Sequence, residues 1–129
     1  MKKKVMDVIS LEKADVLLLI SGIILVKLVP NCSVKKRDLV KFLSSATKLS
    51  AGKNYAIILD GNRTMEVEDE AMLYVSSFRD SRWKALAIVV RVPSGRLYAD
   101  YFIKFAGTSR PIKSFDSLRK ASAWLQEIT

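Results

Sequence analysis

The chain contains no histidine, and this absence removes several classes of active site. Histidine usually activates serine and cysteine nucleophiles, and it is the commonest transition-metal ligand. The single cysteine, Cys32, allows neither an internal disulfide nor a zinc cluster. No glycine-rich phosphate-binding motif is present. We therefore expect a protein that is not an enzyme and that holds no cofactor or metal.

Long apolar runs are also lacking. The most apolar stretch, Val16 to Val26, is shorter than the roughly 20 residues that a helix needs to span a bilayer. Ser21-Gly22 in its middle predicts a turn between two strands. Charged residues interrupt the sequence before this stretch, which is unlike a signal peptide. We expect a cytoplasmic protein without a membrane span.

The 129 residues, half of them hydrophobic, suit one folded domain. Residues 1–15 are expected to form a strand or a loose arm. Apolar periodicity and turn residues then predict strands at 16–20, 23–29, 55–59, 85–92 and 110–115, and helices at 34–49, 68–78, 95–106 and from 117 onward. This order predicts a single α/β domain over residues 16–129, with a mixed, mostly parallel sheet, an N-terminal hairpin and about four helices.

Acidic residues gather directly after the apolar strand predicted at 55–59. Ser33 is predicted to cap the helix before that strand, and Glu68 the helix after it. With Glu68 as the cap, Asp69 and Glu70 fall in the first turn and stabilise the positive end of the helix dipole. Val67 and Met72 have the spacing of a hydrophobic staple. Starting a helix therefore explains these acids without any further function.

Polar residues follow the carboxyl ends of the two central strands, where open α/β sheets usually bind ligands. Four candidates for such a site are Asp60, Arg63, Ser94 and Arg96. An anion at the helix start beside Ser94 would suit this arrangement. The alternative is structural, because Ser94-Gly95 is equally explained as a helix cap and a tight turn.

One helix carries an aromatic stripe at helical spacing, formed by Tyr98, Tyr101, Phe102 and Phe105. Core packing accounts for such a stripe. The alternative is a self-association face that includes Tyr98 and Tyr101, because aromatic residues are enriched at interfaces.

The net charge of +9 is unevenly distributed. Residues 1–59 carry eleven basic and four acidic side chains, residues 60–78 one and five, and residues 79–129 ten and four. An excess of positive charge attracts nucleic acid or anionic membrane. The chain has no nucleic-acid motif, however, and its first predicted helix places lysines as on a solvated face. We do not expect nucleic-acid binding.

Several segments together resemble the STAS-like, or SpoIIAA-like, fold family of small bacterial proteins of unknown function. The resemblance covers residues 16–128 and includes the hairpin "LLLISGIILVKLVPN", Asp60-Gly61, the "SG" at 94–95, Arg110-Pro111 and the final pattern from Phe115 to Leu125. It implies a non-enzymatic module that docks a partner protein. In the antagonists of this group, a serine or threonine near the start of the helix after the central strand is phosphorylated. Here acids occupy that place, and Thr64 is the nearest hydroxyl.

Our expectation is a regulatory or protein-interaction module, able to form a homodimer. Its candidate interaction residues are Asp60, Arg63, Thr64, Glu68, Asp69, Ser94 and Arg96. The alternative is a module that binds a small apolar or anionic ligand, such as a lipid or nucleotide, between its apolar core and the carboxyl edge of the sheet.

Overall fold

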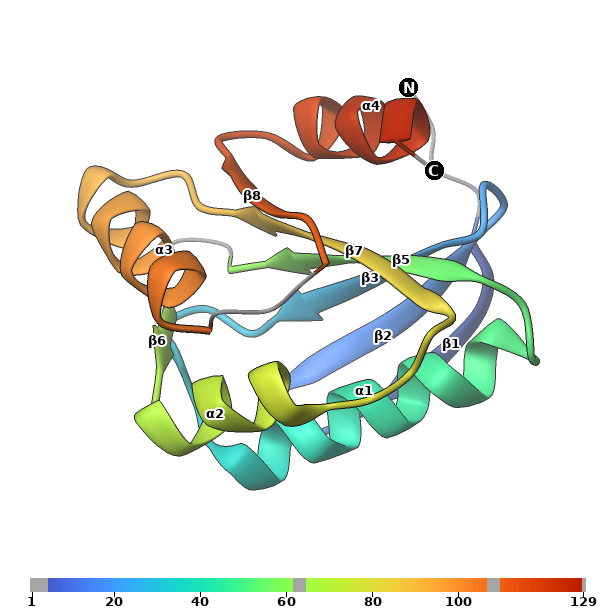
Figure 1. The fold of residues 1–129 in the computed structure, drawn as a ribbon, viewed down its shortest axis with the longest axis horizontal. Coiled ribbons are helices and arrows are strands. Elements are labelled where there is room, and N and C mark those ends of the chain that lie inside the picture. The colour runs from blue at the N-terminus through green and yellow to red at the C-terminus, as the bar shows by residue number, and fades with distance from the viewer. Residues whose placement is uncertain (1–4, 62–64, 107–109, 129) are drawn as a thin grey trace.

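A computed structural model describes residues 5–61, 65–106 and 110–128. These residues form a twisted sheet with helices on both faces (Figure 1). In chain order the elements are β1 (Val5–Ser10), β2 (Ala14–Leu19), β3 (Ile23–Leu28), β4 (Cys32–Val34), α1 (Lys36–Ser50), β5 (Tyr55–Asp60), β6 (Met65–Val67), α2 (Asp69–Ser77), β7 (Trp83–Val89), α3 (Pro93–Ala106), β8 (Ile112–Phe115) and α4 (Leu118–Ile128).

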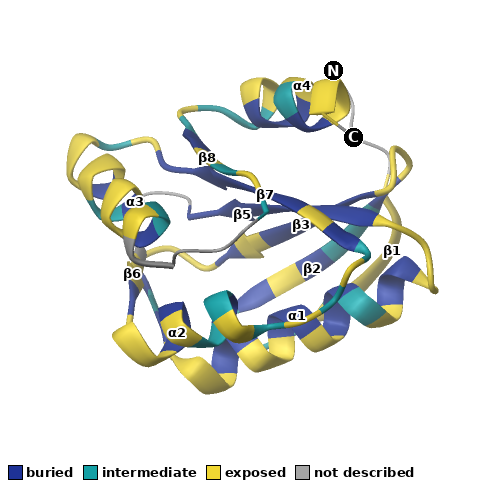
Figure 2. Ribbon diagram, in the orientation of Figure 1, coloured by how far each residue is buried: buried dark blue, intermediate teal, exposed yellow. Residues whose placement is uncertain are grey.

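The main sheet has six strands in the order β1-β2-β3-β5-β7-β8. β1, β2 and β3 are antiparallel neighbours, and the other neighbouring strands are parallel. The predicted single α/β domain, with its mixed sheet, hairpin and four helices, is confirmed in the described residues. The apolar segments at 55–59 and 85–92 lie side by side as β5 and β7, with Ile58 opposite Ala87. All residues of β5 are buried, as a central parallel strand requires (Figure 2).

The helices divide unequally between the faces of the sheet. α1 and α2 lie along one face and α4 lies over the other, while α3 packs against α2, β6 and β8 (Figure 1). A large apolar core joins α1, α2 and α3 to their face of the sheet, and a smaller one lies beneath α4. α4 contacts β5, β7 and β8, at the opposite end of the sheet from β1.

Two short strands were not predicted. β4 and β6 pair in parallel as a separate ribbon, and each leads directly into a helix. Ser33 therefore lies in β4 and the prediction that it caps α1 is wrong. The N-cap is Lys35, whose backbone N–H donates to the carboxylate of Asp38 at 2.9 Å. This helix start is stabilised by the carboxylate of Asp38, which accepts a hydrogen bond from the backbone of the N-cap residue, and not by a hydroxyl at the cap.

The second difference concerns the start of α3. The helix begins at Pro93, so Ser94 lies in its first turn and the prediction that Ser94 is the cap is wrong. Proline suits a first helical position because it has no N–H to leave unpaired there. At its other end, α1 closes at Ala51-Gly52, where both residues adopt the left-handed conformation, with φ of 51° and 82°.

The start of the described chain is a strand. β1 pairs with β2 and forms one edge of the sheet. A register irregularity lies between Val5 and Asp7, after which Val8 faces Leu17 and Ile9 faces Val16. Ile9 packs against the large core, so the side of β1 that carries Ile9 faces α1.

Candidate functional site

The acidic segment lies where β6 passes into α2. Pairing of β6 with β4 fixes this junction, and the N–H of Glu68 donates to the carbonyl of Val34 at 3.0 Å. Glu68 is the N-cap of α2, and Asp69 and Glu70 occupy its first turn, as predicted. Val67 and Met72 are both buried in the same core, as the predicted staple requires.

The acids of this junction face solvent. Glu66, Glu68, Asp69 and Glu70 are all exposed, and none has an ion-pair partner among the residues that the structure describes. Charges at a helix start stabilise it by about 0.3–1 kcal/mol each. Glu68, Asp69 and Glu70 lie at this helix start, whereas Glu66 lies in β6, before the helix.

Helix α3 brings aromatic side chains against the same junction. The hydroxyl of Tyr98 donates to the carbonyl of Val67 at 2.9 Å. The rings of Tyr98 and Tyr101 lie next to each other, with centroids 6.5 Å apart. Phe102 is 1% exposed and belongs to the core, whereas Tyr101 is 46% exposed. The side chain of Phe105 lies outside the described residues. The stripe is therefore part core and part surface.

Exposed apolar side chains border this region. Leu97 is 74% exposed and lies one helical turn before Tyr101, and Leu73 is 55% exposed, one turn after Asp69 on α2. Because α2 packs against α3, both helices contribute to one end of the molecule. We call this region the acidic–aromatic surface: Glu66, Glu68, Asp69, Glu70, Leu73, Leu97, Tyr98 and Tyr101.

The candidates at the carboxyl edge are arranged differently. Asp60 is 4% exposed, and its Oδ1 lies 2.7 Å from Nη1 of Arg91, which follows β7. Ser94 and Arg96 are exposed in the first turn of α3. Arg96 lies near Asp116, and it adds to the effect of Lys120 in lowering the pKa of that carboxyl. Arg63 and Thr64 lie outside the described residues. The observed partner of Asp60 is thus Arg91.

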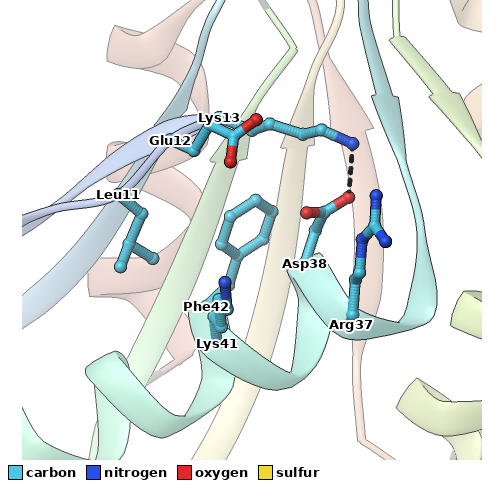
Figure 3. A pocket seen from close by; sticks show the side chains of 7 residues that line it. All are labelled: Leu11, Glu12, Lys13, Arg37, Asp38, Lys41 and Phe42. Carbon is cyan, nitrogen blue, oxygen red and sulfur yellow. Dashed lines mark hydrogen bonds and ion pairs between the residues drawn. The ribbon is translucent and has the colours of Figure 1, made fainter.

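A polar pocket lies elsewhere on the same edge of the sheet. It has a volume of about 360 Å³ and lies between the turn that joins β1 to β2 and the first half of α1 (Figure 3). Its lining residues are Leu11, Glu12, Lys13, Arg37, Asp38, Lys41 and Phe42. Nζ of Lys13 lies 2.7 Å from Oδ2 of Asp38 and donates to the carbonyl of Ser33 at 3.0 Å.

The pocket combines both signs of charge with an apolar floor. The ring of Phe42 lies between the turn and the helix, and the carboxylate of Glu12 is on the turn side (Figure 3). Lys13 and Asp38 neutralise each other, while Glu12, Arg37 and Lys41 have no ion-pair partner among the described residues. Burial acts to raise the pKa of Asp38, but hydrogen bonds from Lys13 and Lys35 outweigh it and hold that pKa below its ordinary value.

The apolar core offers much less space than this pocket. A cavity among Phe42, Val75, Trp83 and Phe102 has a volume of about 20 Å³, close to the space that one water molecule occupies. Within the described residues, no group of three or more potential metal ligands occurs, and no helix is long and apolar enough to cross a membrane.

A comparison with protein families adds one finding. A family model described as "Domain of unknown function (DUF7793)" matches residues 17–129. The chain belongs to the DUF7793 family. Neither the curated proteins nor the solved structures provide a match. The match begins within β2, so β1 precedes the part of this DUF7793 protein that the family describes.

Two features of this DUF7793 domain escaped sequence reasoning. The apolar run predicts a strand over 85–92 that contains Arg91, whereas β7 ends at Val89 and Arg91 lies two residues beyond it. Because Asp60 pairs with Val89 in the sheet, Arg91 comes close to the end of β5. The pocket lies between residues 11–13, in the turn from β1 to β2, and residues 37–42 of α1. These segments are close because β2 pairs with β3 in the register that places Ala14 opposite Leu28. The spacing of residues along the chain does not predict this pocket.

Proposed function

We propose that this DUF7793 protein is a non-enzymatic, STAS-like interaction module that docks a basic partner protein on its acidic–aromatic surface. The observation that carries the proposal is the position of exposed acids beside exposed apolar side chains in an otherwise basic chain. Apolar groups supply area that is removed from water, and the surrounding acids select a partner of opposite charge.

The aromatic groups of this surface are held in place. The hydrogen bond from Tyr98 to Val67 fixes α3 beside the start of α2, so the surface is formed before any partner binds. A preformed surface loses less conformational entropy on association. The resemblance of the sequence to STAS-like domains, which dock partner proteins, supports the same role.

Neutralising the acids tests this function. The triple variant Glu68→Gln, Asp69→Asn, Glu70→Gln keeps the shape of the surface and removes its charge. Compared with the wild-type chain in capture experiments on an extract of the producing cells, this variant should lose a set of basic proteins. Tyr101→Ser should lose the same set, because it removes apolar area from the same surface. A thermal melt checks that each variant is folded.

A matched control places the same charge change elsewhere. Asp15, Asp116 and Glu127 are exposed and lie outside the acidic–aromatic surface, so Asp15→Asn with Asp116→Asn and Glu127→Gln should leave capture unchanged. Equal losses in this control would mean that total charge, and not this surface, determines binding. Unchanged capture by the folded triple variant contradicts the proposal.

A second candidate function is the binding of a small charged ligand, and the pocket of about 360 Å³ favours it. Arg37 and Lys41 would hold an anionic group, while Phe42 and Leu11 contact an apolar part. The core cavity is too small for a lipid chain. A small ligand would therefore bind in the polar pocket and not in the core.

Thermal shift measurements test the second candidate. ATP, GTP and short-chain phosphatidic acid are suitable probes, because a ligand that binds only the folded state raises its melting temperature. A binding probe should raise the melting temperature of the wild-type chain and have a smaller effect on Arg37→Ala with Lys41→Ala. The control variant Lys36→Ala with Lys48→Ala changes two α1 lysines outside the pocket lining. A shift that both pairs of variants retain would place the ligand elsewhere.

A further inference from the structure

Strand β1 has an open edge with apolar side chains. It ends the sheet, and among the described residues no strand pairs with its outer side. Three of its six residues are large, exposed apolar side chains: Val5 at 46%, Met6 at 64% and Val8 at 47%. An exposed edge of this kind is a template for pairing with another strand.

The direction of the backbone groups in β1 follows from its contact with β2. The N–H of Leu11 donates to the carbonyl of Ala14, so Leu11 points its backbone groups toward β2. Because the direction of the backbone N–H and C=O groups alternates along a strand, those of Ile9 also point toward β2, whereas those of Val8 and Ser10 point to the open side. The N–H of Val8 instead donates to the carboxylate of its neighbour Asp7 at 2.8 Å.

We propose that two copies of this chain associate through antiparallel pairing of β1 with β1, which joins their sheets into one. A two-fold axis between two antiparallel copies of β1 passes between two copies of the same residue. A register that pairs Val8 with Val8 of the second copy uses most of the strand. The register shifted by one residue pair would place Asp7 against Asp7, and such like charges directly opposite are destabilising.

Charge complementarity favours a second copy as the occupant of this edge. In the Val8–Val8 register, Asp7 of one copy lies opposite Ile9 of the other, on the face of the sheet that α1 covers. On that face, Lys41 of α1 and Leu11 both line the polar pocket. Pairing gives the Val8 N–H a carbonyl acceptor on the second copy. It thereby frees the Asp7 carboxylate to approach Lys41 of that copy.

Proline at position 8 is the direct test. The Val8 N–H lies outside the ladder with β2, so Val8→Pro should keep the fold while removing the central donor of the proposed interface. The wild-type chain should form a dimer whose dissociation constant is measurable by sedimentation equilibrium. Val8→Pro should be monomeric over the same concentrations, and Val8→Thr, which keeps the N–H and the branched side chain, should still dimerise.

A charge exchange provides a test that does not depend on proline. Asp7→Lys and Lys41→Glu each place like charges together and should raise the dissociation constant roughly tenfold. The double variant restores an opposite pair and should recover the wild-type value. Both positions are exposed, so folding should be unaffected.

Three results would each overturn the proposal: a monomeric wild-type chain, a dimer that folded Val8→Pro retains, or single charge variants that the double variant does not rescue. Loss of the dimer in Tyr101→Ser alone would place self-association on α3. The triple variant of the acidic–aromatic surface should lose its partner but remain dimeric. The dimer and the docking of a partner are therefore tested by different variants, and either proposal can fail without the other.

Discussion

Asp38 serves two structural purposes with one carboxylate. Its Oδ2 accepts a hydrogen bond from the backbone N–H of Lys35 at the start of α1, and another from Nζ of Lys13 at 2.7 Å. The first contact satisfies a donor that the helix cannot pair, and the second ties the turn between β1 and β2 to the helix. The carboxylate has little contact with solvent, since its side chain is 11% exposed.

Removal of this carboxylate should be costly. A hydrogen bond to a charged group contributes about 1.5–3 kcal/mol, so Asp38→Ala should lower the free energy of unfolding by about 2 kcal/mol in urea titrations. Asp116→Ala is the control, because it removes a carboxylate from the exposed pair with Lys120, and exposed ion pairs contribute little. Its unfolding curve should match that of the wild-type chain.

The same comparison has a definite pH dependence. The pKa of Asp38 is lower in the folded state than in the unfolded chain. Its contribution is therefore present above the ordinary carboxyl pKa of about 3.9 and is lost as the pH falls through the folded value. The difference between wild type and Asp38→Ala should shrink at acidic pH. A difference that stays constant from neutral to acidic pH would contradict this account.

At the scale of helices and strands, the long elements were predictable and the short ones were not. β5 and β7 carry continuous apolar runs, and α1 and α4 carry periodic apolar faces, so pattern alone predicts them. β4 and β6 have three residues each, too few for any period. They are strands because they pair with each other.

The candidate surfaces follow the same division. Glu68, Asp69 and Glu70 were predictable at a helix start because that interaction is local. Tyr98 was predicted as part of an aromatic stripe, but its bond to Val67 depends on the packing of α3 against β6. The pair of Asp60 with Arg91 depends likewise on the register of β5 with β7. Interactions between distant segments require the topology as well as the sequence.

In the molecule as a whole, the large core connects nearly every element. It includes residues of β2, β3, β5 and β7, of α1, α2 and α3, and of the small ribbon formed by β4 and β6. Cys32 lies within this core at 4% exposure. Burial raises the pKa of its thiol, and the nearby charge of Lys13 only partly offsets this effect. The thiol is thus both inaccessible and neutral, and a neutral thiol is a poor nucleophile.

The reactivity of Cys32 should therefore report the opening of the whole domain. The β4–β6 ribbon joins the starts of α1 and α2, so exposing Cys32 requires both helices to separate from the sheet. Labelling by a thiol reagent should be far slower than for an added exposed cysteine, such as Ser44→Cys. As urea is added, the rate should rise with the slope of global unfolding. A rate that urea barely changes would mean that the ribbon opens by itself while the sheet remains folded.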